Sequence, residues 1–417
     1  MKNVFLLGNG FDLHHKLPTK YFDFICVAKY LTSNSLSDPI NVGTIFSKCK
    51  ESKNIAECYE LHRQAFDSIN VDFSKAVRIT QLLNDNLWFD YFIKTLNIDL
   101  GWIDFEKEIS TVIQCLDMII SENDVTVHIP SNDLIAAFVL SNFRYFLDVS
   151  HKDSIYAGNR YDIKDAFLKE RIHNSRVYGA NKMAIFEELY SQLQDFNEAL
   201  NIYLCCFVEN ALDIIRDDDY TRKCTINLLN LADSCVTFNY TSTLEKMFSD
   251  KKVFHIHGMA KLDNLVLGVN PNESDDINTD NTSLIKFKKY YQREVKGTDK
   301  EYVNWYRETI NQEKEFRVIV IGHSLDETDK DILTDMFQHA KEIYVTYYNE
   351  KCRDDYINNI IRIFGNSGFD SFKKKKGMLF ISLLNIDYLF DKIKPVELKW
   401  EASWDRNEGE IEAIIRI

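Results

Sequence analysis

The first residues that could do chemistry form a turn near the N-terminus, at Gly8, Asn9, Gly10, Phe11 and Asp12. The turn follows an apolar stretch, residues 4–7, which is typical of a buried strand. Glycine lets the backbone approach a phosphate group closely, and the Asp12 carboxylate could accept hydrogen bonds from a ribose. The usual dinucleotide fingerprint has a third glycine where Leu13 stands, so this motif alone is also compatible with an ordinary tight turn.

Amide and imidazole side chains follow two later apolar stretches. Asn239 comes after residues 235–238, and its amide can donate and accept hydrogen bonds with a hydroxyl group or a water molecule. It could equally cap the helix that follows. His257 ends the stretch 253–257 and is expected to reach the crevice at the strand end, with a purely structural histidine as the alternative. We expect His255 to point elsewhere, so that the two histidines do not chelate one metal ion.

A second glycine turn follows the strongest apolar stretch, residues 317–321, and contains Gly322, His323, Ser324 and Asp329. Gly-x-Ser is half of a hydrolase nucleophile elbow, but Asp326 stands where that motif needs its second glycine. A serine hydrolase is therefore disfavoured. In the middle of the chain, Asp104 and Glu106 could reach over the same crevice, or they could simply begin a helix, where a carboxylate suits the helix dipole.

The elements that must position these residues alternate between strands and helices. Strands are predicted at residues 4–7, 235–238, 253–257, 265–267, 317–321, 343–346 and 378–381. Helical periodicity is found at residues 81–96, 103–121, 131–149, 183–215 and 222–232, whereas the polar residues 32–55 suggest a loop. Strands that alternate with helices predict a parallel sheet, and the carboxyl ends of its strands face the ligand crevice.

The predicted fold is therefore α/β: a Rossmann-like parallel sheet with a large α-helical insertion. Residues 1–55 and 233–394 would form the Rossmann-like domain, and residues 56–232 the helical insert domain. Residues 395–417 would be a C-terminal extension.

Size and charge narrow the class of protein. The 417 residues exceed what one hydrophobic core usually serves, and the net charge of −14 argues against a broad nucleic-acid-binding surface. No stretch is apolar enough to span a membrane, and the N-terminus lacks the features of a signal peptide. The nine cysteines have no paired spacing, which fits reduced thiols, so we expect a cytoplasmic protein.

Taken in order, these motifs resemble the AbiH family of bacteriophage abortive-infection proteins. The resemblance is carried by residues 6–13 with 17–19, residues 238–241, residues 255–258, and residues 322–325 with Asp329. One position departs from it, because Lys16 stands where the family motif usually has glycine. That family in turn resembles a divergent branch of the sirtuin-like NAD-binding fold. The resemblance implies an anti-phage effector that binds NAD and, once activated, hydrolyses its nicotinamide–ribose bond.

The resemblance also assigns roles to residues. Asn239 and His257 would be the catalytic pair, with Asn239 holding the ribose or the attacking water and His257 acting as the base. Gly8 and Gly10 would cradle the pyrophosphate, and Ser324 would contact the adenosine side. The residues expected to bind the nucleotide are Gly8, Asn9, Gly10, Phe11, Asp12, Thr237, Gly322, His323, Ser324 and Asp329. The chain lacks the paired C-x-x-C of a zinc ribbon, so we expect no metal and no zinc-dependent deacetylation.

Two other functions stay open. A nucleotide-sensing module without catalysis would use the same binding residues. A nuclease could use a metal held by Asp12, Asp104, Glu106 and Asp329, although these residues form no compact carboxylate motif. The expected partners are NAD or a related nucleotide, further copies of this chain, and a phage-derived trigger or a partner defence protein. Neither a membrane nor a nucleic acid is expected.

Overall fold

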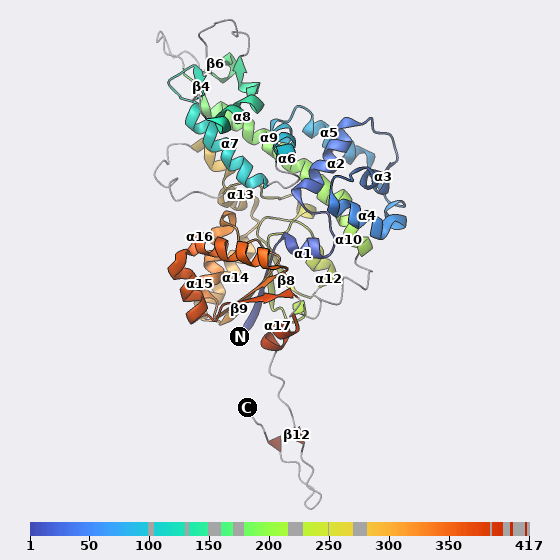
Figure 1. The fold of residues 1–417 in the computed structure, drawn as a ribbon, viewed down its shortest axis with the longest axis vertical. Helices are drawn as coiled ribbons and strands as arrows, with labels where there is room; N and C mark the ends of the chain where they lie inside the picture. The colour runs from blue at the N-terminus through green and yellow to red at the C-terminus, as the bar shows by residue number, and fades with distance from the viewer. Residues whose placement is uncertain are drawn as a thin grey trace, which may run out of the picture.

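The structure is a computed structural model, and it describes residues 1–98, 104–129, 133–148, 160–169, 179–215, 228–248, 250–269, 282–383, 386–394, 401–402 and 413–414. A sheet with its covering helices makes up one half of the molecule, and a group of helices makes up the other (Figure 1). Within the described residues no helix combines the length and the apolar character that a membrane crossing requires.

The central sheet has six strands, and all of its neighbouring pairs are parallel. The strands are β1 (Lys2–Leu7), β7 (Ser234–Thr237), β8 (Lys252–His255), β9 (Phe316–Ile321), β10 (Glu342–Tyr347) and β11 (Leu379–Ser382). Their order across the sheet is β11-β10-β9-β1-β7-β8. When the six strands are numbered 1 to 6 in chain order and the sheet is read from β8 to β11, the order is 3-2-1-4-5-6, as in Rossmann folds. The direction of the strand order reverses between β1 and β9, which is the switch point of the sheet. The predicted α/β, Rossmann-like fold is confirmed.

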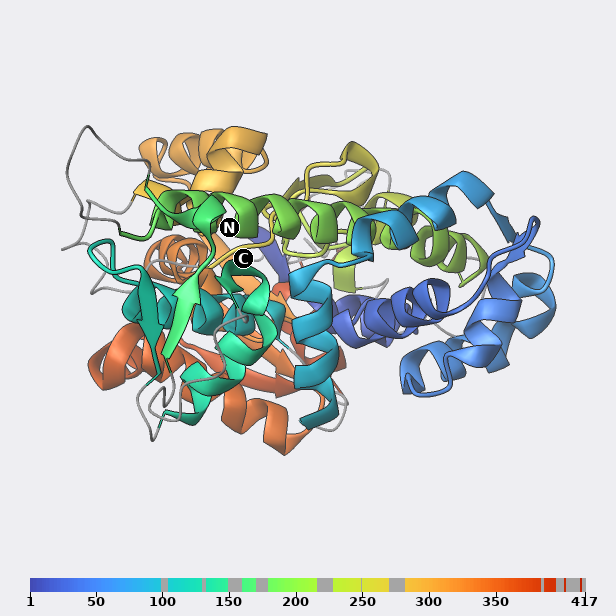
Figure 2. The same cartoon turned by 90° about the horizontal axis from the view of Figure 1, so that it is seen from above.

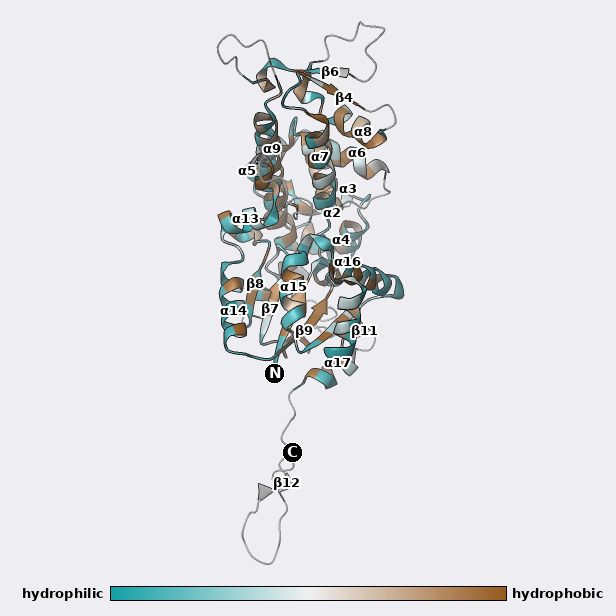
Figure 3. Cartoon of the chain, turned by 90° about the vertical axis from the view of Figure 1, so that its left-hand side faces the viewer, coloured by the Kyte–Doolittle hydropathy of each residue, from teal (hydrophilic) through white to brown (hydrophobic). Residues whose placement is uncertain are grey.

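The apolar first strand explains why the sheet is buried on both faces. Alternate residues of a strand point to opposite faces, so Val4 and Leu6 join one hydrophobic cluster while Phe5 and Leu7 join another. The first cluster includes residues of α14 (Lys300–Asn311), α15 (Lys330–His339) and α16 (Glu350–Lys375). The second includes residues of α12 (Thr243–Met247) and α17 (Ile386–Ile393). Figure 3 shows the mainly brown strands among helices that alternate teal and brown.

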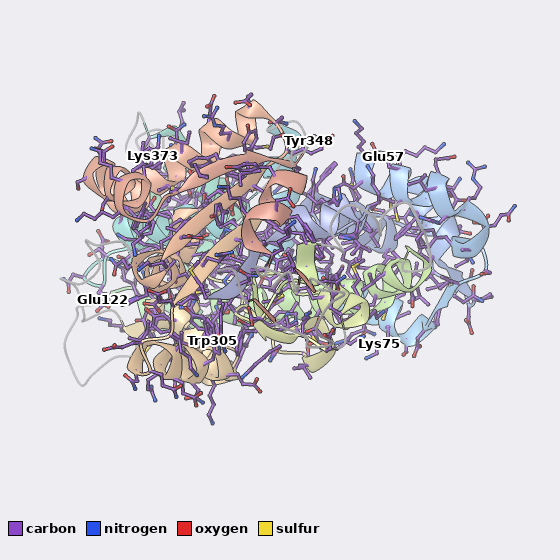
Figure 4. The ribbon with its side chains drawn as sticks, turned by 90° about the horizontal axis from the view of Figure 1, so that it is seen from below. Glu57, Lys75, Glu122, Trp305, Tyr348 and Lys373 are labelled. Carbon is purple, nitrogen blue, oxygen red and sulfur yellow. The ribbon has the colours of Figure 1, made fainter. Side chains whose placement is uncertain are left out.

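Aromatic side chains extend this packing to the edge of the sheet. Trp305 of α14, which is labelled in Figure 4, packs against Phe254 of the edge strand β8. The two ring centroids are 5.2 Å apart. The edge strand is therefore covered by a helix, which keeps its apolar side chain out of solvent.

The helical half has a hydrophobic cluster of its own. Its helices are α2 (Tyr21–Ser33), α3 (Val42–Lys48), α4 (Lys53–Phe66), α5 (Phe73–Leu83), α6 (Leu87–Ile98), α7 (Phe105–Ile119), α8 (Leu134–Asn142), α9 (Lys182–Tyr203) and α10 (Glu209–Ile215). Helix α9 runs along the length of this half and continues through a π turn, Leu204–Val208, into α10 (Figure 2). A small antiparallel sheet joins β4 (Thr126–His128), β6 (Arg160–Ile163) and β5 (Leu147–Asp148), and a shorter one joins β2 (Ile40–Asn41) to β3 (Asn70–Val71).

Three predicted elements are wrong. Residues 32–55 are not a loop, because α3 and the start of α4 lie there, and α3 buries Val42, Ile45 and Phe46 at helical spacing among polar neighbours. The helix predicted over 131–149 ends at Asn142, before β5.

The third wrong prediction is the strand over residues 265–267. This segment is buried but pairs with no strand of the sheet. Gln292 takes the place of a neighbouring strand, because its amide accepts from Leu267 N at 3.1 Å and donates to Leu267 O at 3.0 Å. Of the C-terminal extension, the described residues form a short antiparallel pair, β12 (Glu401–Ala402) with β13 (Ala413–Ile414).

Candidate functional site

Polar side chains gather at the carboxyl ends of the strands, where the loops after β1, β7, β8 and β9 meet. Those buried there are Asp12, Glu106, Thr237, Asn239, Thr241, Thr243, His257, Lys289, His323 and Asp329. Burial of polar groups is costly unless they bond to one another, so their pairing defines the site. They form two groups, which we call the Asp12 group and the Asp329 group.

Three glycines bring the loops after β1 and β9 into direct backbone contact. A Cβ on Gly8 would lie 2.6 Å from His323 Cα, and one on Gly10 would lie 2.7 Å from Gly322 Cα. Gly322 itself has a φ of 65°. The N–H groups of Gly8 and Gly10 donate to Ile321 O at 3.2 Å and to Gly322 O at 2.8 Å. Close packing thus accounts for these glycines, and the two N–H groups expected to cradle a phosphate are already used within the protein.

Two other residues of the first turn lie away from the buried groups. Asn9 is exposed, and its side-chain oxygen accepts from Thr19 Oγ1 at 2.6 Å. Phe11 is buried in the hydrophobic cluster beneath the turn, with its ring centroid 4.5 Å from that of His15. Asn9 therefore braces the segment that follows α1 (Asn9–His14), and Phe11 anchors that helix to the sheet.

The Asp12 group joins the loop after β1 to the loop after β7. Thr241 Oγ1 donates to Asp12 Oδ2 at 2.7 Å, and the Thr241 and Thr243 hydroxyl oxygens are 2.9 Å apart. Thr237 Oγ1 accepts from Asn239 N at 3.1 Å. Asp12 Oδ1 is buried and accepts no hydrogen bond. Burial raises the pKa of Asp12 from 3.8 to about 6, against the opposing effect of its hydroxyl and amide neighbours.

The Asp329 group joins the loops after β8 and β9 to two helices. Asp329 Oδ1 accepts from Lys289 Nζ at 2.8 Å, and Lys289 Nζ lies 2.7 Å from Glu106 Oε2. His323 Nδ1 accepts from Leu325 N at 2.9 Å, so the ring proton is on Nε2, which lies 3.3 Å from Asp329 Oδ2. His257 Nε2 lies 3.1 Å from Asp329 Oδ1, at an angle that completes no hydrogen bond.

Charge pairing sets the protonation of this group. Although burial opposes ionisation of Asp329, the Lys289 ammonium holds the pKa of that carboxyl well below its usual range. Burial raises the pKa of Glu106 to about 8, and the charge of Asp329 acts in the same direction. Burial also lowers the pKa of His257 to about 4, helped by the nearby Lys289 charge. The group therefore combines one ion pair, an acid that is easily protonated and a neutral imidazole.

The two neighbouring histidines diverge as expected. Residues two apart on a continuous strand would share a face, but β8 ends at His255 and the chain turns before His257. His255 Nε2 lies 2.6 Å from Glu245 Oε1 and its Nδ1 lies 3.0 Å from the Asn239 carbonyl oxygen. His257 turns instead toward Asp329.

Three of the remaining candidates have clear places. Ser324 is exposed, and its carbonyl accepts from Asn359 Nδ2 at 3.0 Å, so it lies outside both buried groups. Asp104 is the N-cap of α7 and accepts from Glu106 N at 3.1 Å, which is the helix-start alternative. Glu106, in contrast, reaches the site. The four carboxylates considered for a nuclease do not meet, and no group of three metal-ligating residues is arranged to hold an ion in the described parts of the chain.

Lys289 is a site residue that none of the sequence motifs indicated. It lies on α13 (Lys289–Lys296), whose polar side is turned inward: Lys289, Gln292 and Arg293 are at most 2% exposed, whereas Val295 is 66% exposed. The only signal was the spacing of three long polar residues at helical steps of three and four. That spacing usually marks a solvated face, so nothing local revealed that it was buried.

Comparison with known proteins adds the family. A family model described as bacteriophage abortive infection AbiH matches residues 4–349, which include the two groups and strands β1 to β10. No curated protein and no solved structure matches the chain. The chain belongs to the AbiH family, and this membership implies a role in bacteriophage abortive infection.

Proposed function

We propose that this AbiH protein defends against phage by binding NAD at the carboxyl edge of its sheet and hydrolysing the nicotinamide–ribose bond. One observation carries the proposal. Asp12, Asn239 and His257 are buried in the segments that follow β1, β7 and β8, at the carboxyl edge of a sheet whose switch point lies between β1 and β9, and Rossmann folds bind nucleotides at this edge. The resemblance of the same motifs to the sirtuin-like NAD-binding fold also supports it.

In the proposed reaction the bond between C1′ of the ribose and the nicotinamide nitrogen breaks. The electron pair leaves with neutral nicotinamide, and positive charge develops on the ribose. A water molecule then adds its oxygen to C1′ and loses one proton, so the products are nicotinamide, ADP-ribose and a proton. No oxidant or reductant is required.

The residues of the two groups suit these steps. Asn239 would hold the water or a ribose hydroxyl through its amide. His257 would take the proton, because its low pKa of about 4 leaves the imidazole neutral at neutral pH. Asp329 would act as a positioning residue, since it contacts His257 on one oxygen and His323 on the other.

The test is to measure NAD, nicotinamide and ADP-ribose by mass spectrometry in bacteria that express the chain and are then infected with phage. We expect NAD to fall and both products to rise after infection. Asn239→Ala and His257→Ala should abolish both the loss of NAD and the protection. Ser141→Ala is the matched control, because this exposed side chain lies on α8, belongs to neither group and should leave NAD loss unchanged. Protection by the wild type without any loss of NAD would refute hydrolysis.

One observation favours a second function, nucleotide sensing without catalysis. His257 is buried, and the same low pKa that leaves it neutral makes it a weak base. In a sensor, His257→Ala would keep protection as long as the nucleotide still binds. In a hydrolase the same variant would bind NAD and lose protection, so affinity and protection measured together separate the two functions.

A further inference from the structure

Asp12 carries a buried oxygen, Oδ1, to which none of the described residues donates a hydrogen bond. Resting on the proposed NAD site, we infer that Asp12 is the counter-charge for a cationic part of the ligand: the nicotinamide pyridinium ring and the positive charge that develops on the ribose. Asp12 would then select the oxidised nucleotide, whose nicotinamide is positively charged, over the reduced nucleotide, whose nicotinamide is neutral.

The unsatisfied oxygen is the first step of the argument. Among the carboxylate oxygens of the described residues, Asp12 Oδ1 and Glu245 Oε2 are buried without a hydrogen-bond partner. Glu245 is 34% exposed at its side chain and meets His255 through its other oxygen, whereas Asp12 is only 1% exposed. A buried acceptor left without a donor is costly, and such a cost is typically retained where a ligand uses the group.

The second step is the absence of a protein cation. Within the described chain, no lysine, arginine or histidine nitrogen forms an ion pair with Asp12, and the charge that acts on it is the like charge of Glu209. Glu209 is itself paired, because Lys246 Nζ lies 3.1 Å and Lys261 Nζ 3.4 Å from its Oε2. Asp12 is therefore the uncompensated anion of this edge.

The third step is the contrast with the Asp329 group. There Lys289 supplies a fully buried positive charge between Asp329 and Glu106, so the charge of Asp329 is already compensated and that group offers no free negative charge to a cationic ligand group. A positive charge on a bound nucleotide would thus be drawn toward Asp12, with Asn239 and Thr241 beside it. Preorganised charge of this kind stabilises a cation that develops during bond cleavage.

The partners of Asp12 are held in place by the helical half. The loop after β7, which carries Thr241, is fastened to α10, because Glu209 accepts from Ser242 N at 2.9 Å and from Ser242 Oγ at 2.7 Å. Asp12 Oδ1 is enclosed in this arrangement.

The experiment measures the affinities of NAD+ and NADH by isothermal titration calorimetry. His257→Ala serves as the background so that NAD+ is not consumed, and Asp12→Asn is added to it. We expect the background to prefer NAD+ by about tenfold or more and the Asp12→Asn protein to bind both nucleotides about equally. Asp23→Asn is the matched control, since Asp23 is equally buried but accepts from Ser52, Asn54 and Lys20, and it should keep the preference.

Three other results are possible, and each would overturn either the inference about Asp12 or the proposed function. Equal binding of both nucleotides by the background, or an NAD+ preference that survives Asp12→Asn, would show that Asp12 is not a counter-charge while leaving the NAD site in place. An equal loss of both affinities in Asp12→Asn would make Asp12 a ribose-hydroxyl acceptor and would also overturn the inference. If folded wild-type protein and all variants bind neither nucleotide, the proposed function itself fails.

Discussion

Single residues of this site are arranged at the expense of stability. Among the described residues, no cation pairs with the buried carboxylate of Asp12, and no hydrogen-bond partner is found for the buried Nε2 of His257. Groups that make the folded state less stable at a crevice are typical of sites that act on a ligand. Stability measurements on single variants therefore report on function as well as on packing.

Asp12→Asn should stabilise the protein near neutral pH. The pKa of Asp12 is raised from 3.8 to about 6, so the folded state binds this proton more tightly than the unfolded chain. The free energy of unfolding therefore falls as pH rises between these two pKa values. Above about pH 6 Asp12 is ionised in both states, and the destabilisation by its buried charge is complete. At about 1.4 kcal/mol per pKa unit the cost approaches about 3 kcal/mol.

Urea unfolding at about pH 4 and at about pH 7.5 measures this effect. The Asn variant should gain stability only at the higher pH. An equal change at both pH values would mean that the charge of Asp12 is not what destabilises the fold.

Gly322→Ala should be far more damaging than Gly297→Ala. Both glycines have a φ of 65°, so the backbone penalty for alanine is the same, about 1–2 kcal/mol. A Cβ on Gly322 would lie 2.4 Å from Phe11 N, whereas a Cβ on Gly297 has nothing within 4 Å. The difference between the two variants in urea unfolding isolates the close approach of the loops after β1 and β9. Similar losses would show that the loops can separate without cost.

At the scale of elements, α13 turns a polar face toward the protein and so links the two halves. Its Lys289 bridges Glu106, which comes from α7 of the helical half, and Asp329, which comes from the loop after β9. Its Gln292 holds the extended segment at Leu267 in place of a strand. The helix thus acts as a polar joint, and its stability depends on charge balance rather than on apolar packing.

Lys289→Met should cost about 3–5 kcal/mol at neutral pH, because it leaves the buried carboxylate of Asp329 without its cation. Without Lys289 the pKa of Asp329 should rise above that of the unfolded chain, and the pKa of Glu106, already raised to about 8, should rise further. The folded state then binds more protons, so the loss should shrink as pH falls toward about 5.

Adding Glu106→Gln to Lys289→Met should restore little stability near neutral pH, since Glu106, whose pKa is raised to about 8 even beside Lys289, already carries a proton there. Lys286→Met is the control, because its partner Glu187 is exposed and such pairs contribute about 1 kcal/mol or less. Urea unfolding of the three variants at two pH values is the measurement. A loss in Lys289→Met that does not depend on pH would contradict the charge-balance account.

At the scale of the whole molecule, the hydrophobic core of the helical half is completed by residues from outside the predicted insert. Its hydrophobic cluster includes α2 from the N-terminal part of the chain and Leu265, Leu267 and Phe287 from the C-terminal part. Hydrogen bonds cross in the same way, since Asn197 Nδ2 donates to Leu265 O at 2.9 Å and Tyr203 Oη donates to Pro18 O at 2.7 Å. Movement of the helical half should therefore shift the segments that carry the Asp12 group and the Asp329 group.

A fragment of residues 56–232 should fail to fold cooperatively when it is produced alone. It lacks α2, α3 and the apolar residues that the later segment contributes to its core. Circular dichroism and urea unfolding would show helix without a sharp transition. A cooperative transition for this fragment would show that the insert is an independent domain, as the division by sequence proposed.

Much of the architecture follows from local patterns. Continuous apolar stretches such as residues 4–7 favour strands buried on both faces, and their alternation with helices predicts the parallel sheet. Because the carboxyl ends of parallel strands share one edge, the sequence alone placed Asp12, Asn239, His257 and Asp329 near one another. The order of these motifs was also sufficient to indicate the AbiH family, which the family model confirms.

Only the tertiary structure decided how these residues are paired. Lys289 compensates the charge of Asp329, whereas no cation among the described residues compensates that of Asp12. These pairings depend on contacts between segments far apart in the chain: Lys289 and Asp329 are 40 residues apart, and Asp12 and Thr241 are 229 residues apart. Whether Gly8 and Gly10 face a ligand or a neighbouring loop is equally non-local. Burial sets the cost of a charge, and burial is a property of the packed molecule rather than of any stretch of sequence.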